Sequence, residues 1–413
     1  MQMNNVPKGW NIKSMGDCFR FLRTKSLSRA ETECSGDVKY IHYGDIHTKY
    51  PLIISPKEID LFISAEQAVN ADLLCSGDLI LLDASEDYEG TTKCIELSNV
   101  LPEDKIISGL HTMALRDDHG IFANNFKAYI TSMPYVKQNF WKQISGVKVY
   151  GISKDSLKKI KVLVPPIEEQ KKIAEILETW DRAIEELSDL IAEKKELKRG
   201  LMQRLLTGTQ RLPGFTKPWQ ETKLDALLNV VSIRNKELKI KTVLSVTNNR
   251  GFVLPEEQFA RVVASEDLSS YKIVKRGDFA YNPSRLNVGS IDRLDYYDEG
   301  VLSPMYVVFK CNKKLHSDYM KHWITTAEFN TKVRNSAQGS VRETVDFKTL
   351  SSIKIFLPND VTEQKAIADV LSKADTEIDL LNQQLDVLRE QKRGLMQKLL
   401  TGEIRVKVDT ETC

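Results

Sequence analysis

One eleven-residue segment of this 413-residue chain occurs twice. Residues 198–208 read KRGLMQRLLTG and residues 392–402 read KRGLMQKLLTG, so all positions but one are identical at an offset of 194 residues. The tripeptide Glu-Gln-Lys recurs at the same offset, at residues 169–171 and 363–365. A repeat of this period predicts that one structural unit is used twice, so the function belongs to a paired arrangement.

Each repeat contains a segment that predicts one long helix. Residues 169–206 and 363–400 contain no proline, and each has a single glycine. Their apolar residues alternate at spacings of four and three, which is typical of a coiled-coil seam. The seam residues are Ile173, Leu177, Trp180, Ile184, Leu187, Ile191, Leu201 and Leu205 in the first helix and Ile367, Leu371, Ala374, Ile378, Leu381, Leu385, Leu388, Leu395 and Leu399 in the second. Two such stripes can bury each other, so we expect the helices to pair.

Polar and flexible residues interrupt the helical pattern at matching places. Lys198 and Lys392 occupy seam positions, where the stem can pack while the charge reaches water. Gly200 and Gly394 each cost about 1 kcal/mol relative to alanine inside a helix. Because both glycines stand at the equivalent place, we expect another helix to approach the backbone closely there.

The remainder of each half has the pattern of a mixed α/β region. A polar lead with a tryptophan (Trp10, Trp219) opens each half, and short β-like runs follow, such as 38–43 and 242–247. A Gly-Asp turn precedes an apolar strand in both halves, at 76–82 and 276–281. Strand-like runs at 160–165 and 353–358 end in proline.

Composition sets limits on the class of protein. The formal net charge is only +2, so there is no global basic signature, although a basic face can still exist. Six scattered cysteines without a C-x-x-C pair fit reduced thiols in a cytoplasmic protein. No window approaches the ~18 consecutive apolar residues of a membrane span, so we expect a cytoplasmic protein without membrane association.

The sequence shows no complete catalytic motif. It lacks a Walker-type phosphate loop and any G-x-G, and no nucleophile–base set is present. Residues 282–285 (NPSR) resemble only superficially the Asn-Pro-Pro-Tyr motif of adenine methyltransferases and favour a turn or a DNA-facing loop. Glu169 and Glu363 have the E-x-K spacing of a nuclease site but stand where a helix start favours glutamate. His42, Asp45 and His47 could hold a metal, yet surface or core structure in a β-rich segment is the favoured interpretation, and we expect no metal site.

At this point the residues resemble a known family. A variable α/β region ends in VPPIEEQKKIA (164–174), a long helix ends in KRGLMQRLLTG, and the arrangement occurs twice. This resembles the specificity subunit of type I restriction–modification enzymes. The stretches 40–46 (YIHYGDI), 110–116 (LHTMALR) and 279–285 (FAYNPSR) are also similar to parts of that family's target-recognition domains.

The resemblance implies a fold and a division of the chain. The fold class is α+β, with two globular α/β target-recognition domains separated by two long antiparallel coiled-coil helices in a pseudo-two-fold arrangement. The domains are then 1–166 (recognition domain 1), 167–208 (central spacer helix), 209–358 (recognition domain 2), 359–405 (C-terminal spacer helix) and 406–413 (tail).

The resemblance also implies a function and partners. Each recognition domain would read one half of a bipartite, asymmetric double-stranded DNA target, and the helices would set the number of unread base pairs. The helices would dock two methyltransferase subunits, and a translocase–nuclease subunit would join the complex. The chain would be non-catalytic and hold no cofactor, with S-adenosylmethionine in the methyltransferase subunits.

Candidate DNA-binding residues follow from the chemistry of base and phosphate contacts. Arginine and lysine suit guanine, asparagine and glutamine suit adenine, and small polar or basic groups suit phosphates. The candidates are Tyr43, His47, Lys49, Asn124, Asn125, Lys137, Lys142 and Lys148 in the first domain and Asn248, Asn249, Arg250, Asn282, Ser284, Arg285, Gln338 and Arg342 in the second. For any single residue, a solvated surface role is the competing interpretation.

Two rival functions belong to other classes. The first is a coiled-coil scaffold whose α/β domains bind proteins instead of DNA. The second is a self-contained methyltransferase, which the missing cofactor loop disfavours.

Overall fold

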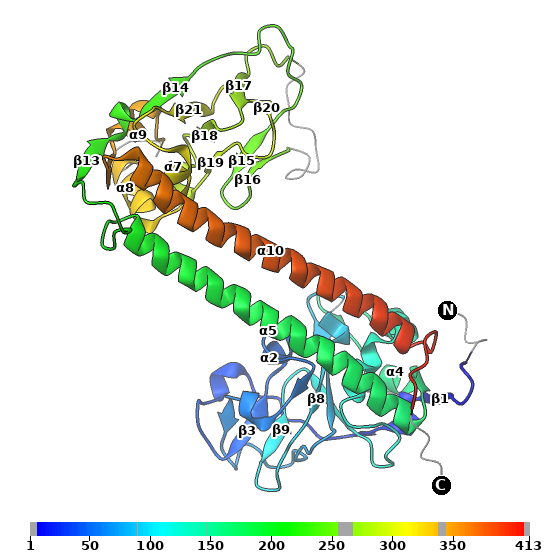
Figure 1. Ribbon diagram of the computed structural model, residues 1–413. Coiled ribbons are helices and arrows are strands. Elements are labelled where there is room, and N and C mark those ends of the chain that lie inside the picture. The colour runs from blue at the N-terminus through cyan, green and yellow to red at the C-terminus, as the bar shows by residue number, and fades with distance from the viewer. Residues whose placement is uncertain (1–5, 89, 147, 255–266, 338–343, 409–413) are drawn as a thin grey trace. The chain divides into compact units, whose positions relative to one another are not determined.

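Two compact units make up the chain. The computed structural model describes residues 6–88, 90–146, 148–254, 267–337 and 344–408. Unit 1 comprises residues 1–187 and 384–413, and unit 2 comprises residues 188–383. Both divisions fall inside the long helices α5 (Ile167–Leu205) and α10 (Val361–Leu399), so each unit holds one half of each helix (Figure 1).

The halves of α5 and α10 pack against each other within each unit. In unit 2, Lys194 pairs with Glu377 and Lys198 with Asp375, so residue numbers rise along one helix as they fall along the other and the segments are antiparallel. All the seam residues named above are buried or half-buried. The two long helices expected from the heptad pattern are confirmed, and they begin and end within two residues of the proline-free segments 169–206 and 363–400.

Unit 1 contains a mixed sheet that forms the body of its domain. Its five-stranded sheet has the order β2-β10-β6-β8-β4, and a three-stranded sheet has the order β5-β3-β9. The strands of unit 1 are β1 (Asn11–Ser14), β2 (Arg20–Phe21), β3 (Val38–Ile41), β4 (Ile53–Ile54), β5 (Phe62–Ile63), β6 (Leu79–Leu82), β7 (Ala84–Ser85), β8 (Cys94–Leu97), β9 (Ile106–Ser108), β10 (Thr112–Arg116), β11 (Tyr150–Gly151) and β12 (Lys161–Val164). The apolar run after the Gly-Asp turn at residue 78 is therefore the central strand β6, as expected.

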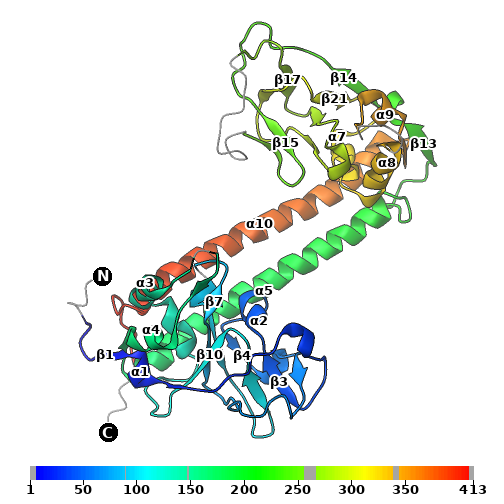
Figure 2. The same ribbon diagram turned by 180° about the vertical axis from the view of Figure 1, so that it is seen from behind.

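Short helices surround the sheet of unit 1. They are α1 (Met15–Cys18), α2 (Tyr43–Thr48), α3 (Pro134–Gln143) and α4 (Lys154–Lys159), with 3₁₀ turns η1 (Arg29–Glu31), η2 (Pro56–Glu58), η3 (Gly90–Thr92) and η4 (Lys127–Ser132). Figure 2 shows α3 beside the end of α10. The largest core cluster of unit 1 includes residues of η4, α3 and both long helices, among them Tyr129, Phe140, Leu177 and Leu399. The domain and its helix ends therefore share one core.

The described residues of the domain in unit 2 form a four-stranded antiparallel sheet, three two-stranded sheets and three helices. The four-stranded sheet has the order β14-β21-β18-β19. The strands of unit 2 are β13 (Trp219–Lys223), β14 (Leu228–Val231), β15 (Ser245–Thr247), β16 (Gly251–Val253), β17 (Lys272–Lys275), β18 (Phe279–Tyr281), β19 (Ile291–Arg293), β20 (Glu299–Leu302), β21 (Val307–Cys311) and β22 (Lys354–Pro358). The helices of its domain are α7 (Ser317–Trp323), α8 (Ala327–Ala337) and α9 (Phe347–Ser352), with 3₁₀ turns η5 (Leu224–Ala226) and η6 (Leu286–Val288). Leu205, Trp323, Phe329 and Leu371 share the largest core cluster of this unit.

Each domain is closed by the same strand pair. The lead strand β1 pairs antiparallel with β12 in unit 1, and β13 pairs antiparallel with β22 in unit 2. The proline-ended strands expected at 160–165 and 353–358 are confirmed by these pairs. Together with the family described below, the mixed domains and long helices confirm the α+β fold class.

A glutamine in the first turns of each long helix ties that helix to its domain. The Gln170 amide donates to the Pro165 carbonyl at 2.8 Å and accepts from the Ala123 amide at 2.8 Å. The Gln364 amide donates to the Pro358 carbonyl at 2.9 Å and accepts from the His316 amide at 2.7 Å. Because both glutamines are buried, these bonds fix where the chain turns from strand into helix.

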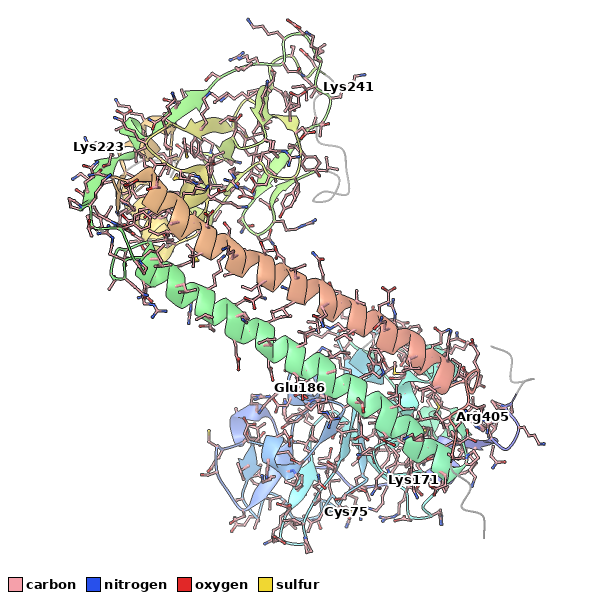
Figure 3. All side chains as sticks on the ribbon, in the orientation of Figure 1. Cys75, Lys171, Glu186, Lys223, Lys241 and Arg405 are labelled. Carbon is pink, nitrogen blue, oxygen red and sulfur yellow. The ribbon has the colours of Figure 1, made fainter. Side chains whose placement is uncertain are left out.

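The neighbouring glutamates close a second connection. The Glu169 carboxylate accepts hydrogen bonds from the Trp10 indole at 3.2 Å and from Arg405 Nε at 2.9 Å (Figure 3 labels Arg405). The Glu363 carboxylate accepts in the same way from Trp219 at 3.1 Å and from Arg211. The carboxylates of both E-x-K glutamates therefore bind a tryptophan and an arginine at the start of a long helix. This is the structural role favoured above.

Two expectations from the sequence are wrong. A Cβ added at Gly200 or Gly394 would meet nothing within 4 Å, so no helix among the described residues approaches either glycine closely. Both lie on the outer face of their helix, two residues beyond a seam position, which explains the open space. The run 38–43 is also not one strand, because β3 ends at Ile41 and α2 begins at Tyr43. Across the part of the chain that is described, no helix is long and apolar enough to cross a membrane.

Candidate nucleic-acid interface

Several loops of unit 1 gather at one end of its domain. The neutral ring of His42 accepts a hydrogen bond from the Gly44 amide at 3.1 Å and so caps α2, and burial lowers the pKa of this histidine. The Tyr43 ring is tilted by 38° against the His42 ring, with centroids 4.4 Å apart, and lies edge-on to His111 at 5.4 Å. His111 has a φ of +53° in the β9–β10 turn and contacts Asp83 at 3.3 Å. Three segments that are distant in sequence therefore meet at His111, which contacts both Tyr43 and Asp83.

Two further loops join the same end of the domain. His47 lies 3.6 Å from Asp87 of the segment after β7. The Tyr88 ring lies 4.5 Å from that of Tyr150, whose strand β11 pairs with β7. Tyr88 is 45% exposed and Tyr43 is 37% exposed, so this surface presents aromatic rings to solvent.

The predicted residues of unit 1 fall into separate places. Tyr43 and His47 lie within this loop cluster, Lys49 follows α2 and pairs with Asp60 at 2.6 Å, and Lys148 is exposed just before β11. Asn125 lies elsewhere, because its side chain hydrogen-bonds Glu178 of α5 and its backbone amide donates to Glu96 at 2.7 Å.

The other candidates of unit 1 are also outside the loop cluster. Asn124 directly precedes Asn125, before η4. Lys137 and Lys142 are on α3, where the Lys137 ammonium lies 5.0 Å from the centre of the Trp141 ring. Contact with DNA by any of these residues stays a prediction.

The predicted residues of unit 2 are brought together more closely. Asn248, Asn249 and Arg250 form the exposed turn between β15 and β16, where the Arg250 amide donates to Thr247 Oγ1 at 3.0 Å. Ser290 connects this hairpin to the next loop, since its hydroxyl donates to the Val246 carbonyl at 2.7 Å.

The loop after β18 lies against that hairpin. The backbone amide of Asn282 donates to the Ser290 carbonyl at 3.2 Å. The Asn282 side-chain oxygen Oδ1 accepts from the backbone amide of Ser284 at 3.1 Å. Ser284 and Arg285 are exposed. Val345 donates its amide to the Pro283 carbonyl at 3.0 Å, so the chain that follows residue 343 reaches the same place. The predicted candidates Gln338 and Arg342 lie outside the described residues.

The candidates chosen from the sequence leave out several exposed or half-buried residues of these two loop clusters. Tyr88, His111 and Tyr150 were missed in unit 1, and Met305, 59% exposed and in contact with Asn282, was missed in unit 2. Aromatic and apolar residues do not form the bidentate hydrogen bonds to bases from which the candidates were predicted. A signal was present in Tyr88, an aromatic residue within a polar turn segment.

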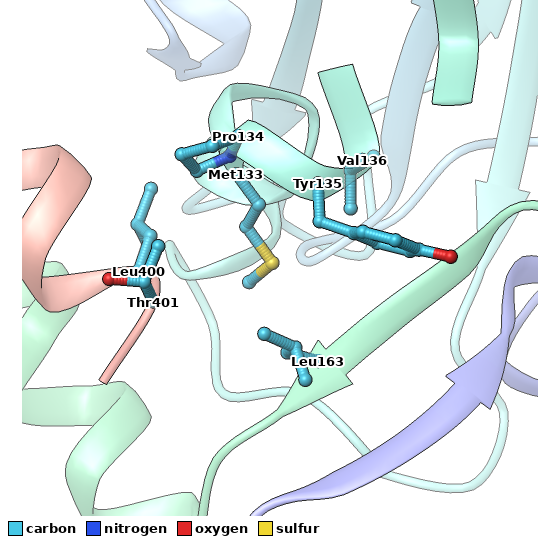
Figure 4. A pocket seen from close by; sticks show the side chains of 7 residues that line it. All are labelled: Met133, Pro134, Tyr135, Val136, Leu163, Leu400 and Thr401. Atoms are coloured by element: carbon cyan, nitrogen blue, oxygen red, sulfur yellow. The ribbon is translucent and has the colours of Figure 1, made fainter. Parts of the chain in front are cut away.

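The described residues lack the side-chain clusters that bind a metal ion. No group of three or more His, Cys, Asp or Glu side chains could hold a metal ion among them. Asp45 instead pairs with Arg29 at 2.6 Å. A cavity in unit 1 between Met133, Leu163 and Leu400 has a volume of about 10 Å³ (Figure 4), which is the size of one water molecule.

Comparison with known proteins adds to this geometry. The family described as "Type I restriction modification DNA specificity domain" matches residues 7–196 and again residues 217–390. The chain belongs to this family of type I restriction–modification specificity subunits. Each match covers one domain and most of the long helix that follows it, which is the repeat seen in the sequence.

Individual relatives agree over the full length. The chain is similar to the type I restriction enzyme MjaVIII specificity subunit of Methanocaldococcus jannaschii, with 24% identity, 97% of this chain and 94% of the relative covered. It is similar to the putative MjaX specificity subunit of the same organism, with 24% identity and coverage of 98% and 96%. The S subunit structure from M. genitalium has the same fold, with 14% identity, a TM-score of 0.59 and coverage of 97% of each chain.

A specificity subunit recognises a DNA sequence and is the non-catalytic component of its system. The predicted recognition function is therefore confirmed, and the scaffold alternative is not favoured. Within this specificity subunit, the two loop clusters carry different residues in the two repeats.

Proposed function

We propose that each domain of this specificity subunit reads one half of a bipartite, asymmetric double-stranded DNA target. The helix pair would fix the number of unread base pairs between the halves. It would also carry two methyltransferase subunits, which hold S-adenosylmethionine, and a translocase–nuclease subunit would complete the assembly. Because the target is chromosomal DNA, the proposed location is the cytoplasm.

The observation that carries the proposal is the different chemistry of the two loop clusters. Unit 1 presents Tyr43, Tyr88 and His111, whereas unit 2 presents Asn248, Asn249, Arg250, Ser284 and Arg285. Asparagine and arginine make bidentate hydrogen bonds to adenine and guanine in the major groove, and an aromatic surface cannot reproduce those bonds. Two different reading surfaces on a duplicated frame support two different half-sites.

The outer faces of the helices support docking of two partner copies. Arg199, Gly200 and Gln203 recur as Arg393, Gly394 and Gln397, and these residues point away from the helix seam. Packing inside the chain does not explain why these residues are identical in the two repeats. A glycine within a helix costs about 1 kcal/mol relative to alanine. A partner subunit that contacts the bare helix backbone would explain why a glycine is present in both repeats. Because the two faces are equivalent, they suit two copies of the same partner.

Methylation mapping tests the reading of two half-sites. The chain is co-expressed with the methyltransferase subunit encoded beside it, and methylated adenines are mapped across the host genome. The proposal expects one bipartite motif with two unlike halves. A double substitution Arg250→Ala and Arg285→Ala should relax one half by about 1–3 kcal/mol of discrimination and leave the other half unchanged.

A matched control uses an arginine on the other side of strand β18 in the same domain. Arg276 precedes β18, whereas Arg285 follows it, and Arg276 is exposed and pairs with Asp298 at 2.9 Å. Arg276→Ala should leave the methylated motif as it is. A single continuous motif, or relaxation of both halves by the double substitution, contradicts the proposal.

A further inference from the structure

Two ion pairs join α5 to α10, and they use the same two positions of the repeat. In unit 1, Lys392 of α10 pairs with Asp181 of α5. In unit 2, Lys198 of α5 pairs with Asp375 of α10. Each lysine is separated from the other by 194 residues, and so is each aspartate. The same lysine–aspartate contact therefore joins the two helices in both units.

In unit 1, the aspartate also contacts the recognition domain. The hydroxyl of Tyr129, a fully buried residue of η4, donates to Asp181 Oδ2 at 2.8 Å. The Lys392 ammonium lies 5.7 Å from the centre of the Tyr129 ring. We call Tyr129, Asp181 and Lys392 junction 1, since it connects both helices and the domain.

Unit 2 builds the same connection with a different residue. His322 of α7 is 4% exposed, and its Nδ1 lies 3.7 Å from Asp375 Oδ2. The other ring nitrogen, Nε2, is 2.9 Å from the Ser372 hydroxyl of α10. We call Lys198, His322, Ser372 and Asp375 junction 2.

The chemistry of the junctions suits a role in aligning the two helices better than a role in stabilising the fold. A lysine at a seam position replaces an apolar residue that would pack better, and a partly buried ion pair contributes little net stability. A polar seam residue does, however, select one alignment of the helices. The apolar seam repeats every seven residues and tolerates a slide of that length, but in unit 2 such a slide would place Ala368 or Asn382 opposite Lys198 in place of Asp375.

We propose that junctions 1 and 2 hold each recognition domain on the helices in one alignment, and thereby set how strictly the subunit discriminates between targets with different numbers of unread base pairs. The inference rests on the proposed function, because it presupposes a bipartite target. One added base pair moves a half-site by about 3.4 Å along the duplex. A domain held on the helices through Tyr129 or His322 cannot follow that movement, whereas a loosened domain can.

Charge reversal in junction 1 tests the inference in the complex with the methyltransferase subunit. The variants are Lys392→Asp, Asp181→Lys and the double exchange, in which the Tyr129 hydroxyl can still donate to the carboxylate or accept from the ammonium. The exchange of Lys172 and Glu175, an exposed pair at 2.7 Å on α5, is the matched control. A triple variant, Tyr129→Phe, Asp181→Leu and Lys392→Leu, removes the junction without leaving a buried polar group unpaired.

The readout is the ratio of methylation at the natural spacing to methylation at spacings one base pair shorter and longer. Each single reversal and the triple variant should lower this ratio by about tenfold, equivalent to about 1.4 kcal/mol. The double exchange should restore it, and the control exchange should leave it unchanged. An unchanged ratio in the triple variant, or no recovery in the double exchange, overturns the inference. A wild-type complex without a bipartite motif instead overturns the proposed function.

Discussion

Arg211 and Glu363 form a bidentate ion pair, with Nε–Oε1 and Nη2–Oε2 distances of 2.6 and 2.7 Å. The glutamate is fully buried, and the Trp219 indole donates to the same carboxylate. One carboxylate at the start of α10 therefore holds the segment that leaves α5 and the lead strand of the second domain. Glu169, Trp10 and Arg405 repeat the arrangement in unit 1.

Arg211→Met should destabilise unit 2 by on the order of 3 kcal/mol, because it leaves the buried Glu363 carboxylate without its counter-charge. Arg211→Lys should recover only part of this, since lysine cannot form the bidentate pair. Urea denaturation followed by tryptophan fluorescence measures the loss. Arg276→Met breaks an exposed pair in the same unit and should change stability by less than about 0.5 kcal/mol. Equal losses in both variants would show that Glu363 does not depend on its arginine.

Stability should fall as the pH is lowered from about 6.5 to about 4 because of His322. Burial lowers the pKa of this histidine to about 4, and Asp375 opposes the shift. The unfolded chain binds the proton near pH 6.5 and the folded chain only near pH 4, so acid favours the unfolded state by up to about 3 kcal/mol. His322→Gln removes this titration. The difference in unfolding free energy between wild type and variant should change with pH within that window, and a constant difference contradicts the assignment.

The long helices could be predicted from the sequence because their information is local. A heptad pattern without proline specifies a helix and its buried face, and α5 and α10 begin and end within two residues of the proline-free segments 169–206 and 363–400. The strands β6, β12, β18 and β22 could also be predicted from the sequence, since a turn or a proline delimits each apolar run.

The partners of the helices could not be predicted, because they come from the parts that do not repeat. Tyr129 donates a hydrogen bond to Asp181 at 2.8 Å, whereas the His322 ring lies 3.7 Å from Asp375, so a phenol in one unit and an imidazole in the other face the equivalent aspartates. The environment of Gly200 was predicted wrongly for a related reason. A duplicated glycine indicates that a side chain is excluded at that position, but it does not show whether another part of this chain occupies the space. The candidate site could be predicted at the level of loops, as with Asn248 and Asn282, while the convergence of segments at His111 depends on tertiary packing.

Lys127→Met should destabilise unit 1 by about 3–5 kcal/mol, because Glu96 is buried with it. The Glu96 carboxylate accepts from Lys127 Nζ at 2.9 Å and from the backbone amides of Asn125 and Ala128. Burial already raises the pKa of Glu96, so the variant should be least destabilised at acidic pH, where the carboxyl is neutral. Adding Glu96→Gln removes the charge and should recover most of the loss in thermal denaturation. A loss that is the same at pH 5 and pH 8 would contradict this account.

Gly200→Ala and Gly394→Ala should stabilise the isolated chain and weaken its assembly. The added methyl group meets nothing within 4 Å, so each substitution gains about 1 kcal/mol of helix stability. If a methyltransferase subunit contacts the bare backbone at each glycine, the same methyl group intervenes in the complex. Differential scanning calorimetry should show a higher melting temperature for the chain alone, and native mass spectrometry should show one partner copy lost for each substitution. Asp386→Ala, which alters an exposed residue of α10 outside the repeated face, should leave both partner copies in place. Full assembly of the double glycine variant would exclude these faces as the docking sites.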